Sequence, residues 1–413
     1  MRKILVLGWG LLLGCQSAPQ PVADYILEVD SGRFDRVDAV VSVEFEGISG
    51  PVHLFEVTQG LRRPTPVQIE VGTPNRLYFV LTDETPRETV RRFELFVGGE
   101  NSDKSSSKLS MLNEEGKYLE LRLSDAPVLR YNYGTVEPPD PSTPKIQARN
   151  AYIHPVWTPR GIVVTDDFNP DHLHQRGIWN AWVKTEFEGR HPDFWNLGDG
   201  TGTVRFEAFD AQEVGPVFSR LKIRHRHVDL SAPEGEKAVL SEIWTLRLYS
   251  VGGKFRGFYL MDLESVQTVV ADSPLTLSEY HYGGMAFRGA REWTPDVAWF
   301  LTSEGKERIE GDDSRADWII IGGASEEAAQ GTAILSDPEN LRSPQPLRIH
   351  PEMPYTAFSP VRLGKIELEP GDRIESRYRY IFFDGKPGIS EVSPYWSDFV
   401  EPPVVTITPN TVN

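Results

Sequence analysis

Short runs of alternating apolar and polar residues recur along this chain, and no stretch sustains the period of an α-helix. Alternation with a period of two gives a β-strand one apolar face and one polar face. Residues 40–45 (VVSVEF) and 93–97 (FELFV) are typical, and turn-forming residues separate such runs at intervals of about ten residues. The pattern predicts an all-β protein in which residues 325–330 are the single helix candidate.

The runs fall into two groups on either side of a polar, serine-rich segment, NSDKSSSK, at residues 101–108. Residues 23–100 predict a small β-sandwich. Residues 109–400 carry longer runs and predict a large antiparallel sandwich, with residues 401–413 as a C-terminal tail. The serine-rich segment is predicted to be a linker, and a long hairpin loop is the alternative.

The N-terminus predicts a lipoprotein signal and tether at residues 1–22. A charged start precedes a short apolar run, and Gly14 followed by Cys15 resembles a lipobox in which Cys15 is acylated. An ordinary cleaved signal is the alternative. Gln16 after the cysteine favours the outer membrane, with the protein facing the periplasm or the cell surface. Because Cys15 is the only cysteine, the mature chain has no disulfide and no cysteine metal ligand.

The overall charge excludes one class of partner. The chain has a formal net charge of -17, whereas nucleic-acid binding requires a basic face for phosphates. An anionic small substrate is not excluded, because local arginines can dominate one cleft. Beyond the signal, no stretch approaches the roughly 20 apolar residues of a membrane-spanning helix.

Residues 152–202 concentrate the side chains that favour a functional site. This stretch holds four of the nine histidines and four of the ten tryptophans, together with paired aspartates and arginines. The histidines and tryptophans are His154, Trp157, His172, His174, Trp179, Trp182, His191 and Trp195. Indole rings stack on the apolar faces of sugars, so Trp179, Trp182 and Trp195 are predicted to bind substrate, or alternatively to fill the core.

The sequence DHLHQRG at residues 171–177 carries the predicted catalytic chemistry. If it is extended, His172, His174 and Arg176 share one face. Imidazole suits proton transfer near neutral pH, and arginine can hold a carboxylate or an oxyanion. The alternative is that Arg176 pairs with Asp166 or Asp167. A further alternative is a divalent metal bound by His172 and His174.

Residues 278–284 (SEYHYGG) are the predicted partner of that segment. Alternation would place Glu279 and His281 on one face as acid and base, and either one, or His154, could be the third ligand of a metal. The alternative is a hairpin with a tight Gly-Gly turn. Other residues predicted to bind substrate are His154, Asp193, Tyr282, Arg288 and Tyr355. A second pair, His225 and His227, is predicted to lie on a solvated face.

Several blocks resemble a known bacterial family. These blocks are YIHP (152–155), TDDF (165–168), DHLHQRGIW (171–179), DFW (193–195) and YGGMAFR (282–288). They are similar to the family labelled "methane oxygenase PmoA", which is also a domain of unknown function (DUF6807-like). The resemblance covers roughly residues 109–390. Gln175 stands where that family usually has a second histidine.

The resemblance implies a large supersandwich of the galactose-mutarotase type, a fold used by epimerases, glycosidases and polysaccharide lyases. A methane monooxygenase subunit needs membrane-spanning helices, which this chain lacks. We therefore predict a carbohydrate-active lipoprotein enzyme that cleaves a glycosidic linkage in an oligosaccharide or polysaccharide fragment by acid–base catalysis. Hydrolysis is favoured over a lyase or epimerase reaction, and no cofactor is predicted. The alternatives are a non-catalytic glycan-binding lipoprotein and a metal-dependent oxidoreductase.

Overall fold

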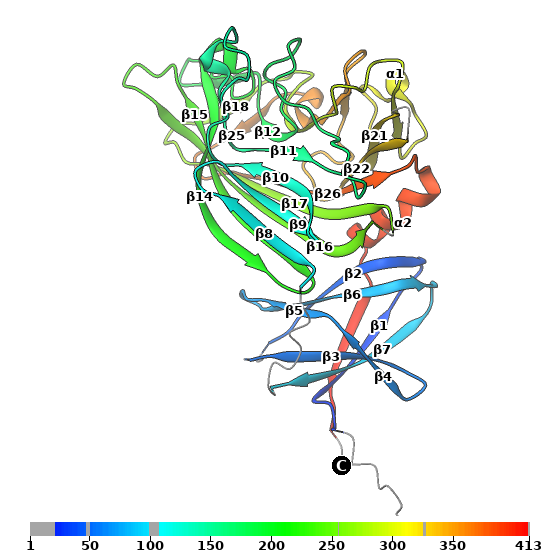
Figure 1. Ribbon diagram of the computed structural model, residues 1–413. Helices are drawn as coiled ribbons and strands as arrows, with labels where there is room; N and C mark the ends of the chain where they lie inside the picture. The colour runs from blue at the N-terminus through cyan, green and yellow to red at the C-terminus, as the bar shows by residue number, and fades with distance from the viewer. Residues whose placement is uncertain (1–20, 47–49, 99–106, 255, 325–327, 412–413) are drawn as a thin grey trace, which may run out of the picture.

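The computed structural model describes residues 21–46, 50–98, 107–254, 256–324 and 328–411 (Figure 1). The predicted signal, Cys15 and most of the serine-rich segment therefore lie outside the described residues. Within them, five antiparallel sheets and very little helix confirm the all-β prediction.

Two sheets form a sandwich near the N-terminus. The larger has the order β27-β1-β7-β3-β4 and the smaller the order β2-β6-β5. Their strands are β1 (Tyr25–Asp30), β2 (Arg36–Glu44), β3 (Val52–Thr58), β4 (Leu61–Thr65), β5 (Val67–Glu70), β6 (Arg76–Thr85), β7 (Val90–Val97) and β27 (Val404–Pro409). Leu27 and Phe93 of one sheet pack with Val41 and Phe79 of the other in a single apolar cluster.

The C-terminal segment is not a tail. Residues 404–409 form β27, which pairs with β1 from Val404 opposite Asp30 to Pro409 opposite Tyr25. Val405 and Ile407 pack against the small core. The sequence of this segment does alternate with a period of two. Its partner strand β1 lies at the other end of the chain, so the sequence around residues 404–409 could not predict the pairing.

The larger part of the chain is a sandwich of two eight-stranded antiparallel sheets (Figure 1). One contains β8 (Leu109–Glu114), β9 (Tyr118–Leu123), β10 (Ala126–Asn132), β11 (Tyr152–Val156), β12 (Ile178–Ala181), β19 (Gly284–Arg288), β24 (Tyr355–Phe358) and β23 (Leu347–Ile349). The other contains β14 (Gly202–Val214), β15 (Phe218–Asp229), β16 (Lys237–Gly253), β17 (Phe258–Val269), β26 (Arg373–Asp384), β22 (Ala329–Ser336), β21 (Trp318–Ala324) and β20 (Ala298–Thr302). Buried side chains from both sheets, such as Leu129 and Leu263, form the main core.

A small sheet and a few helices complete the structure. The sheet has the order β13 (Thr185–Phe187), β18 (Leu275–Leu277) and β25 (Ile366–Leu368). The helices are α1 (Arg308–Gly311), α2 (Ile389–Val400), η1 (Lys145–Gln147), η2 (Leu197–Asp199) and η3 (Pro360–Leu363). The predicted helix at residues 325–330 lies partly outside the described residues. Its described end is wrong, because residues 329–330 begin β22. We missed α2 because Pro394 lies inside it and argues against a helix.

The small sandwich packs on the large one through specific contacts. Gln68 accepts backbone hydrogen bonds from Val217 at 3.1 Å and Phe218 at 3.0 Å. Tyr78 joins Phe218 in a shared buried cluster. At α2, the buried Arg36 and Asp398 form an ion pair of 2.8 Å that ties β2 to the helix.

The prediction that His225 and His227 lie on a solvated face was wrong. Both are fully buried between the two large sheets. His227 Nε2 donates to Glu242 at 2.9 Å, and His225 Nε2 is hydrogen-bonded to the Tyr131 hydroxyl at 2.6 Å. Arg226 between them is exposed. The two histidines share one face of the strand, as the alternation implies, but that face is the inner one. Their partners, Glu242 on β16 and Tyr131 on β10, come from other strands and give no local signal.

Candidate functional site

The histidine-rich segment at residues 171–177 is a turn and not an extended strand. The backbone NH of His172 donates to Asn169, and that of Gln175 donates to His172, both at 3.0 Å. The prediction that His172, His174 and Arg176 alternate along a strand was therefore wrong. The turn still places the two imidazoles next to each other, with ring centroids 5.6 Å apart.

Arg176 points into the protein. Its side chain is fully buried, and its guanidinium donates to the carbonyls of Leu173 and Gln147 and to Asp167 at 2.6 Å. It also lies over the Phe168 ring at 3.5 Å. Each of its three guanidinium nitrogens is already hydrogen-bonded within the protein. Arg176 therefore fixes the shape of the loop and is not placed to orient a substrate.

A third histidine, His350, completes the group. Its ring centroid lies 5.4 Å from that of His172. Its Nδ1 accepts backbone hydrogen bonds from Glu352 at 3.2 Å and Met353 at 2.9 Å. Because Nδ1 is occupied as an acceptor, Nε2 is the ring nitrogen that remains for a ligand. Sequence reasoning assigned His350 no role, since nothing local shows that residues 350–353 lie against the turn at residues 171–177.

Burial and nearby arginines keep these imidazoles neutral. Burial, assisted by His172 and by the guanidinium of Arg149, lowers the pKa of His174 to about 4. Burial, with Arg348 and His172 next, lowers the pKa of His350 to about 4 as well. The pKa of His172 is also lowered, chiefly by burial. At neutral pH the three rings are therefore neutral in the unliganded protein. In His350 the Nδ1 lone pair is already engaged by the backbone, so Nε2 carries the hydrogen and presents a donor, whereas His172 and His174 can accept a proton.

Four aromatic residues form a wall at this end of the sheet. Trp179 lies 4.7 Å from Trp195 and 5.9 Å from Tyr355, measured between ring centroids. Tyr282 lies 5.8 Å from Tyr355 and 6.1 Å from Trp195. Trp179 Nε1 and the Tyr355 hydroxyl are buried and have no hydrogen-bond partner in the described part of the chain. The structure thus brings together four of the predicted substrate-binding residues. Trp179, Trp195 and Tyr355 are fully buried in the second apolar cluster, which is the core role given as the alternative for the tryptophans, and Tyr282 alone of the four is partly exposed.

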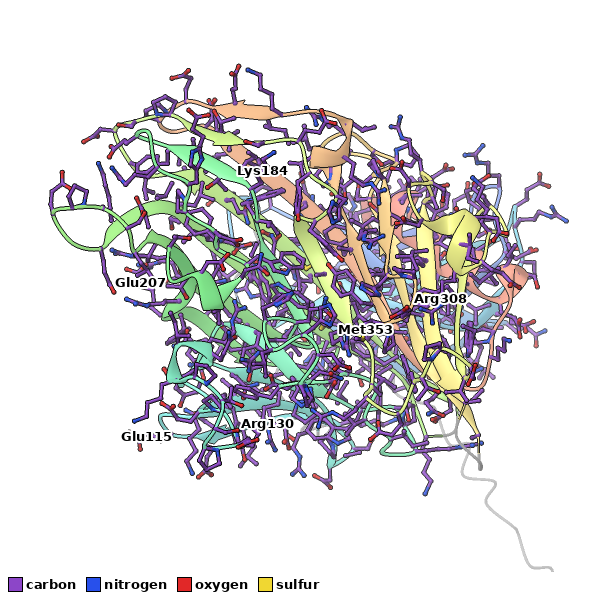
Figure 2. All side chains as sticks on the ribbon, turned by 90° about the horizontal axis from the view of Figure 1, so that it is seen from above. Glu115, Arg130, Lys184, Glu207, Arg308 and Met353 are labelled. Atoms are coloured by element: carbon purple, nitrogen blue, oxygen red, sulfur yellow. The ribbon has the colours of Figure 1, made fainter. Side chains whose placement is uncertain are left out.

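Arginines connect the aromatic wall to the histidines. Arg288 is almost fully buried, donates to Gln175 Oε1 at 2.7 Å and contacts Met353 Sδ at 3.5 Å. Arg348 lies over the Tyr282 ring at 5.0 Å. Arg308 donates to the Met353 carbonyl at 3.0 Å, and Figure 2 shows Arg308 and Met353 on the same side of the molecule. The site is therefore rich in cations as well as in imidazoles.

Three predicted binding residues have other partners. Trp182 Nε1 donates to Gln267 at 2.8 Å in the second buried cluster. Asp193 accepts hydrogen bonds from the backbone of Trp195 and of Asn196, both at 2.8 Å, so it holds a turn. His154 is half-buried and hydrogen-bonded through Nδ1 to Thr165 at 2.9 Å.

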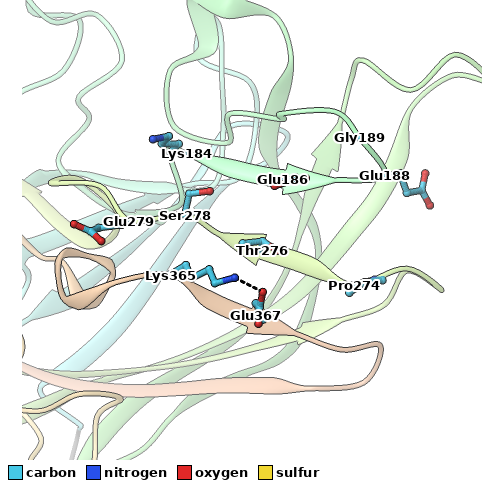
Figure 3. Close-up of a pocket in the computed structure, with 10 residues that line it drawn as sticks. All are labelled: Lys184, Glu186, Glu188, Gly189, Pro274, Thr276, Ser278, Glu279, Lys365 and Glu367. Atoms are coloured by element: carbon cyan, nitrogen blue, oxygen red, sulfur yellow. Dashed lines mark hydrogen bonds and ion pairs between the residues drawn. The ribbon is translucent and has the colours of Figure 1, made fainter.

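Glu279 and His281 do not form the predicted acid–base pair. Residues 278–283 have no regular secondary structure, so the expected alternation is absent. Glu279 is exposed and lines a separate pocket of about 550 Å³ beside the small sheet, with Lys184, Lys365 and Glu367 (Figure 3). Figure 2 shows Lys184 well away from Met353. His281 is exposed, and its ring lies tilted against those of Tyr280 and Tyr282, with centroid distances of 4.2 and 4.5 Å.

Comparison with known proteins gives the family. The model of the family of unknown function DUF6807 matches residues 118–397. This chain belongs to DUF6807. No curated protein matches it. An alpha-mannosidase from Enterococcus faecalis V583 aligns with 94% of this chain and 46% of the mannosidase chain, at 10% identity and a TM-score of 0.44. The chain thus spans less than half the length of that enzyme.

The DUF6807 region contains both the imidazole group and the aromatic wall. The family description assigns no activity, so the oxygenase label and the mutarotase-type fold remain predictions. Within the described residues, no group of three or more His, Cys, Asp or Glu side chains is arranged to hold a metal ion. None of the described helices is long and apolar enough to cross a membrane.

Proposed function

We propose that this DUF6807 protein is a carbohydrate-active enzyme in which His172, His174 and His350 carry out acid–base catalysis. The observation that carries the proposal is the contact of these neutral imidazoles with one another beside the wall of Trp179, Trp195, Tyr282 and Tyr355. Imidazole is suited to accept and return a proton near neutral pH.

The partly exposed edge of the wall is suited to a sugar ring. Tyr282 offers a ring face for stacking, and the buried Trp195 and Tyr355 behind it hold it in place. The guanidinium of Arg348, which lies over the Tyr282 ring, offers polar donors for sugar hydroxyls. Binding sites commonly combine a mostly apolar lining with a few polar groups that fix orientation. This combination supports a carbohydrate over a purely apolar ligand.

Two of the three aspartates near the histidines are paired with arginines and only Asp171 is exposed, which favours proton transfer at carbon over hydrolysis. Hydrolysis of glycosides usually requires two free carboxyl groups flanking the bond. Asp166 is bound by Arg291 at 3.0 Å, and Asp167 by Arg176 at 2.6 Å. We therefore place elimination or epimerisation ahead of hydrolysis. In elimination a base removes a proton from a ring carbon, a double bond forms, and the glycosidic oxygen leaves with a proton.

Product analysis on a panel of polysaccharides tests the proposal. Elimination gives a new reducing end and an ultraviolet-absorbing double bond, hydrolysis gives only the reducing end, and epimerisation exchanges a ring proton with solvent. We expect His174→Gln and His350→Gln each to reduce turnover at least 100-fold, while His53→Gln, in the small sandwich, has no effect. Full activity of both site variants would reject the proposal.

Two alternatives have their own readouts. If a bound oligosaccharide stays chemically unchanged after long incubation, the protein is a glycan-binding lipoprotein and not an enzyme. Elemental analysis of the purified protein tests the metal-dependent oxidoreductase, with His172 and His174 as the predicted ligands. A stoichiometric metal that is lost in the double variant of these histidines would favour that alternative over metal-free acid–base catalysis.

A further inference from the structure

Arg149 is a buried guanidinium without an acceptor. The side chain is 3% exposed, and its Nε, Nη1 and Nη2 atoms make no hydrogen bond within the described residues. Burial lowers its pKa to about 10, which leaves it charged at neutral pH. Arg288, at 1% exposure, also has an unpartnered Nε. Burying charge without a partner is costly, so these groups indicate a ligand that is absent from the protein itself.

Two of the neighbouring carboxylates are already occupied, whereas Asp171, next to His172, is exposed. Asp166 is bound by Arg291 at 3.0 Å and lies 3.9 Å from Arg288, and Asp167 accepts from Arg176 and from the Tyr152 hydroxyl at 2.5 Å. At the other side of the site, Asp312 is shared by Arg348 and Arg362, at 3.0 and 2.9 Å. The local balance is therefore positive in a chain whose net charge is -17.

Hydrogen bonds place both arginines against the histidine segment at residues 171–177. Arg288 donates to Gln175 Oε1 at 2.7 Å, and the carbonyl of Gln147, two residues before Arg149, accepts from Arg176 at 2.6 Å. In agreement with this placement, Arg149 and Arg288 both lower the pKa of His174, after burial and His172. Arg308 Nη2 and Arg348 Nε are also buried without a partner. An anion at this position would meet several donors at once.

We propose that the substrate is an acidic sugar whose carboxylate or sulfate group binds Arg149 and Arg288 beside His174. The identity of the ligand as a sugar rests on the proposed function, whereas the need for an anion rests on the guanidinium of Arg149, which has no hydrogen-bond partner among the described residues, and on the unpartnered Nε of Arg288. Guanidinium groups bind such oxyanions through two parallel hydrogen bonds. The bound anion also offsets the arginines, which allows the imidazoles to take up a proton more readily.

Binding to the full chain, followed by tryptophan fluorescence, tests the inference. The probes are oligosaccharides of galacturonate and glucuronate, the same oligosaccharides after reduction of their carboxyl groups, and a sulfated galactan oligosaccharide. We expect one of the acidic types to bind at least tenfold more tightly than the reduced, uncharged sugars. The preferred acidic type identifies whether the anion is a carboxylate or a sulfate.

Arginine variants locate the anion. Arg149→Met and Arg288→Met should each weaken acidic-sugar binding at least tenfold and leave the uncharged sugar unaffected. Arg205→Met is the matched control, because Arg205 lines the same cavity of about 250 Å³ as Arg149 but is exposed and paired with Glu236. Equal affinity for charged and uncharged sugars, or unchanged affinity in both site variants, would overturn the inference.

Thermal stability separates a ligand-binding role from a structural one. Without ligand, Arg149→Met should keep or raise the melting temperature, since it removes an unpaired buried charge. A variant that unfolds or melts earlier would show a structural role and overturn the inference. If acidic sugars bind through Arg149 but are never turned over, only the catalytic proposal fails. If an uncharged sugar is turned over through His174, only the inference fails.

Discussion

Replacing Glu242 with glutamine tests how a buried carboxylate holds the large sandwich together. Glu242 is fully buried between the sheets. Its Oε2 accepts from His227 Nε2 at 2.9 Å. Its Oε1 accepts four hydrogen bonds, from Asn180 (2.8 Å), Trp244 (2.7 Å), Ser265 (2.6 Å) and Gln267 (3.1 Å).

The expected loss follows from the charge on those bonds. Hydrogen bonds to a charged group contribute about 1.5–3 kcal/mol, against about 1 kcal/mol for neutral ones. Glutamine keeps the shape and one acceptor, so the five bonds together lose about 5 kcal/mol. Part of this is offset because a buried charge is no longer desolvated. We expect Glu242→Gln to lower the free energy of unfolding by about 3 kcal/mol.

Urea denaturation followed by tryptophan fluorescence measures this change. The control is Glu236→Gln, because Glu236 is exposed and its pair with Arg205 contributes at most about 1 kcal/mol. Burial raises the pKa of Glu242, but the hydrogen bond from His227 and the nearby imidazole of His225 outweigh it and hold the pKa well below its usual range. The stabilisation is thus present above pH 4.5 and lost as the pH falls through the folded-state pKa. A midpoint equal to that of Glu236→Gln would refute the reasoning.

Three further predictions concern the site loop, the histidines and the N-terminus. Arg176→Met should lower the free energy of unfolding by about 3–5 kcal/mol in urea denaturation, because Asp167 loses its buried partner; unchanged stability would return Arg176 to a substrate-binding role. The pKa values of His174 and His350, about 4 when folded and 6.5 when unfolded, imply stability that falls as the pH drops from 6.5 towards 4; the double glutamine variant should flatten this part of the profile. Cys15→Ala should move the protein from the outer-membrane fraction to the soluble fraction, and an unchanged distribution would reject lipidation.

Local periodicity was sufficient to predict the all-β fold but not the pairing of its ends. A strand pattern needs only alternate residues, so the long strands of the large sandwich are visible in the sequence. β27 shows the same pattern, yet its partner β1 lies almost a chain length away. α2 contains Pro394, which removes the signal that would have revealed it.

The sequence predicted which residue types form the candidate site, but not the direction in which their side chains point. Trp179, Trp195 and Tyr355 come together because β12 and β24 are brought into one sheet and the turn after Asp193 folds back on them. The direction of Arg176 depends on turn hydrogen bonds that no residue pattern reveals. No sequence pattern indicated Arg149. Only the folded structure shows that its guanidinium is buried without a hydrogen-bond partner among the described residues.

The buried carboxylate and the candidate site are linked through one strand. On β12, Ile178 packs in the main core and Trp179 in the second cluster, so neighbouring residues face opposite sides of the sheet. Asn180 faces inward and donates to Glu242, while Trp179 faces the aromatic wall. The Glu242 network therefore fixes the strand that positions Trp179. In Glu242→Gln, acidic-sugar binding should weaken along with stability, whereas Arg149→Met should weaken binding without loss of stability.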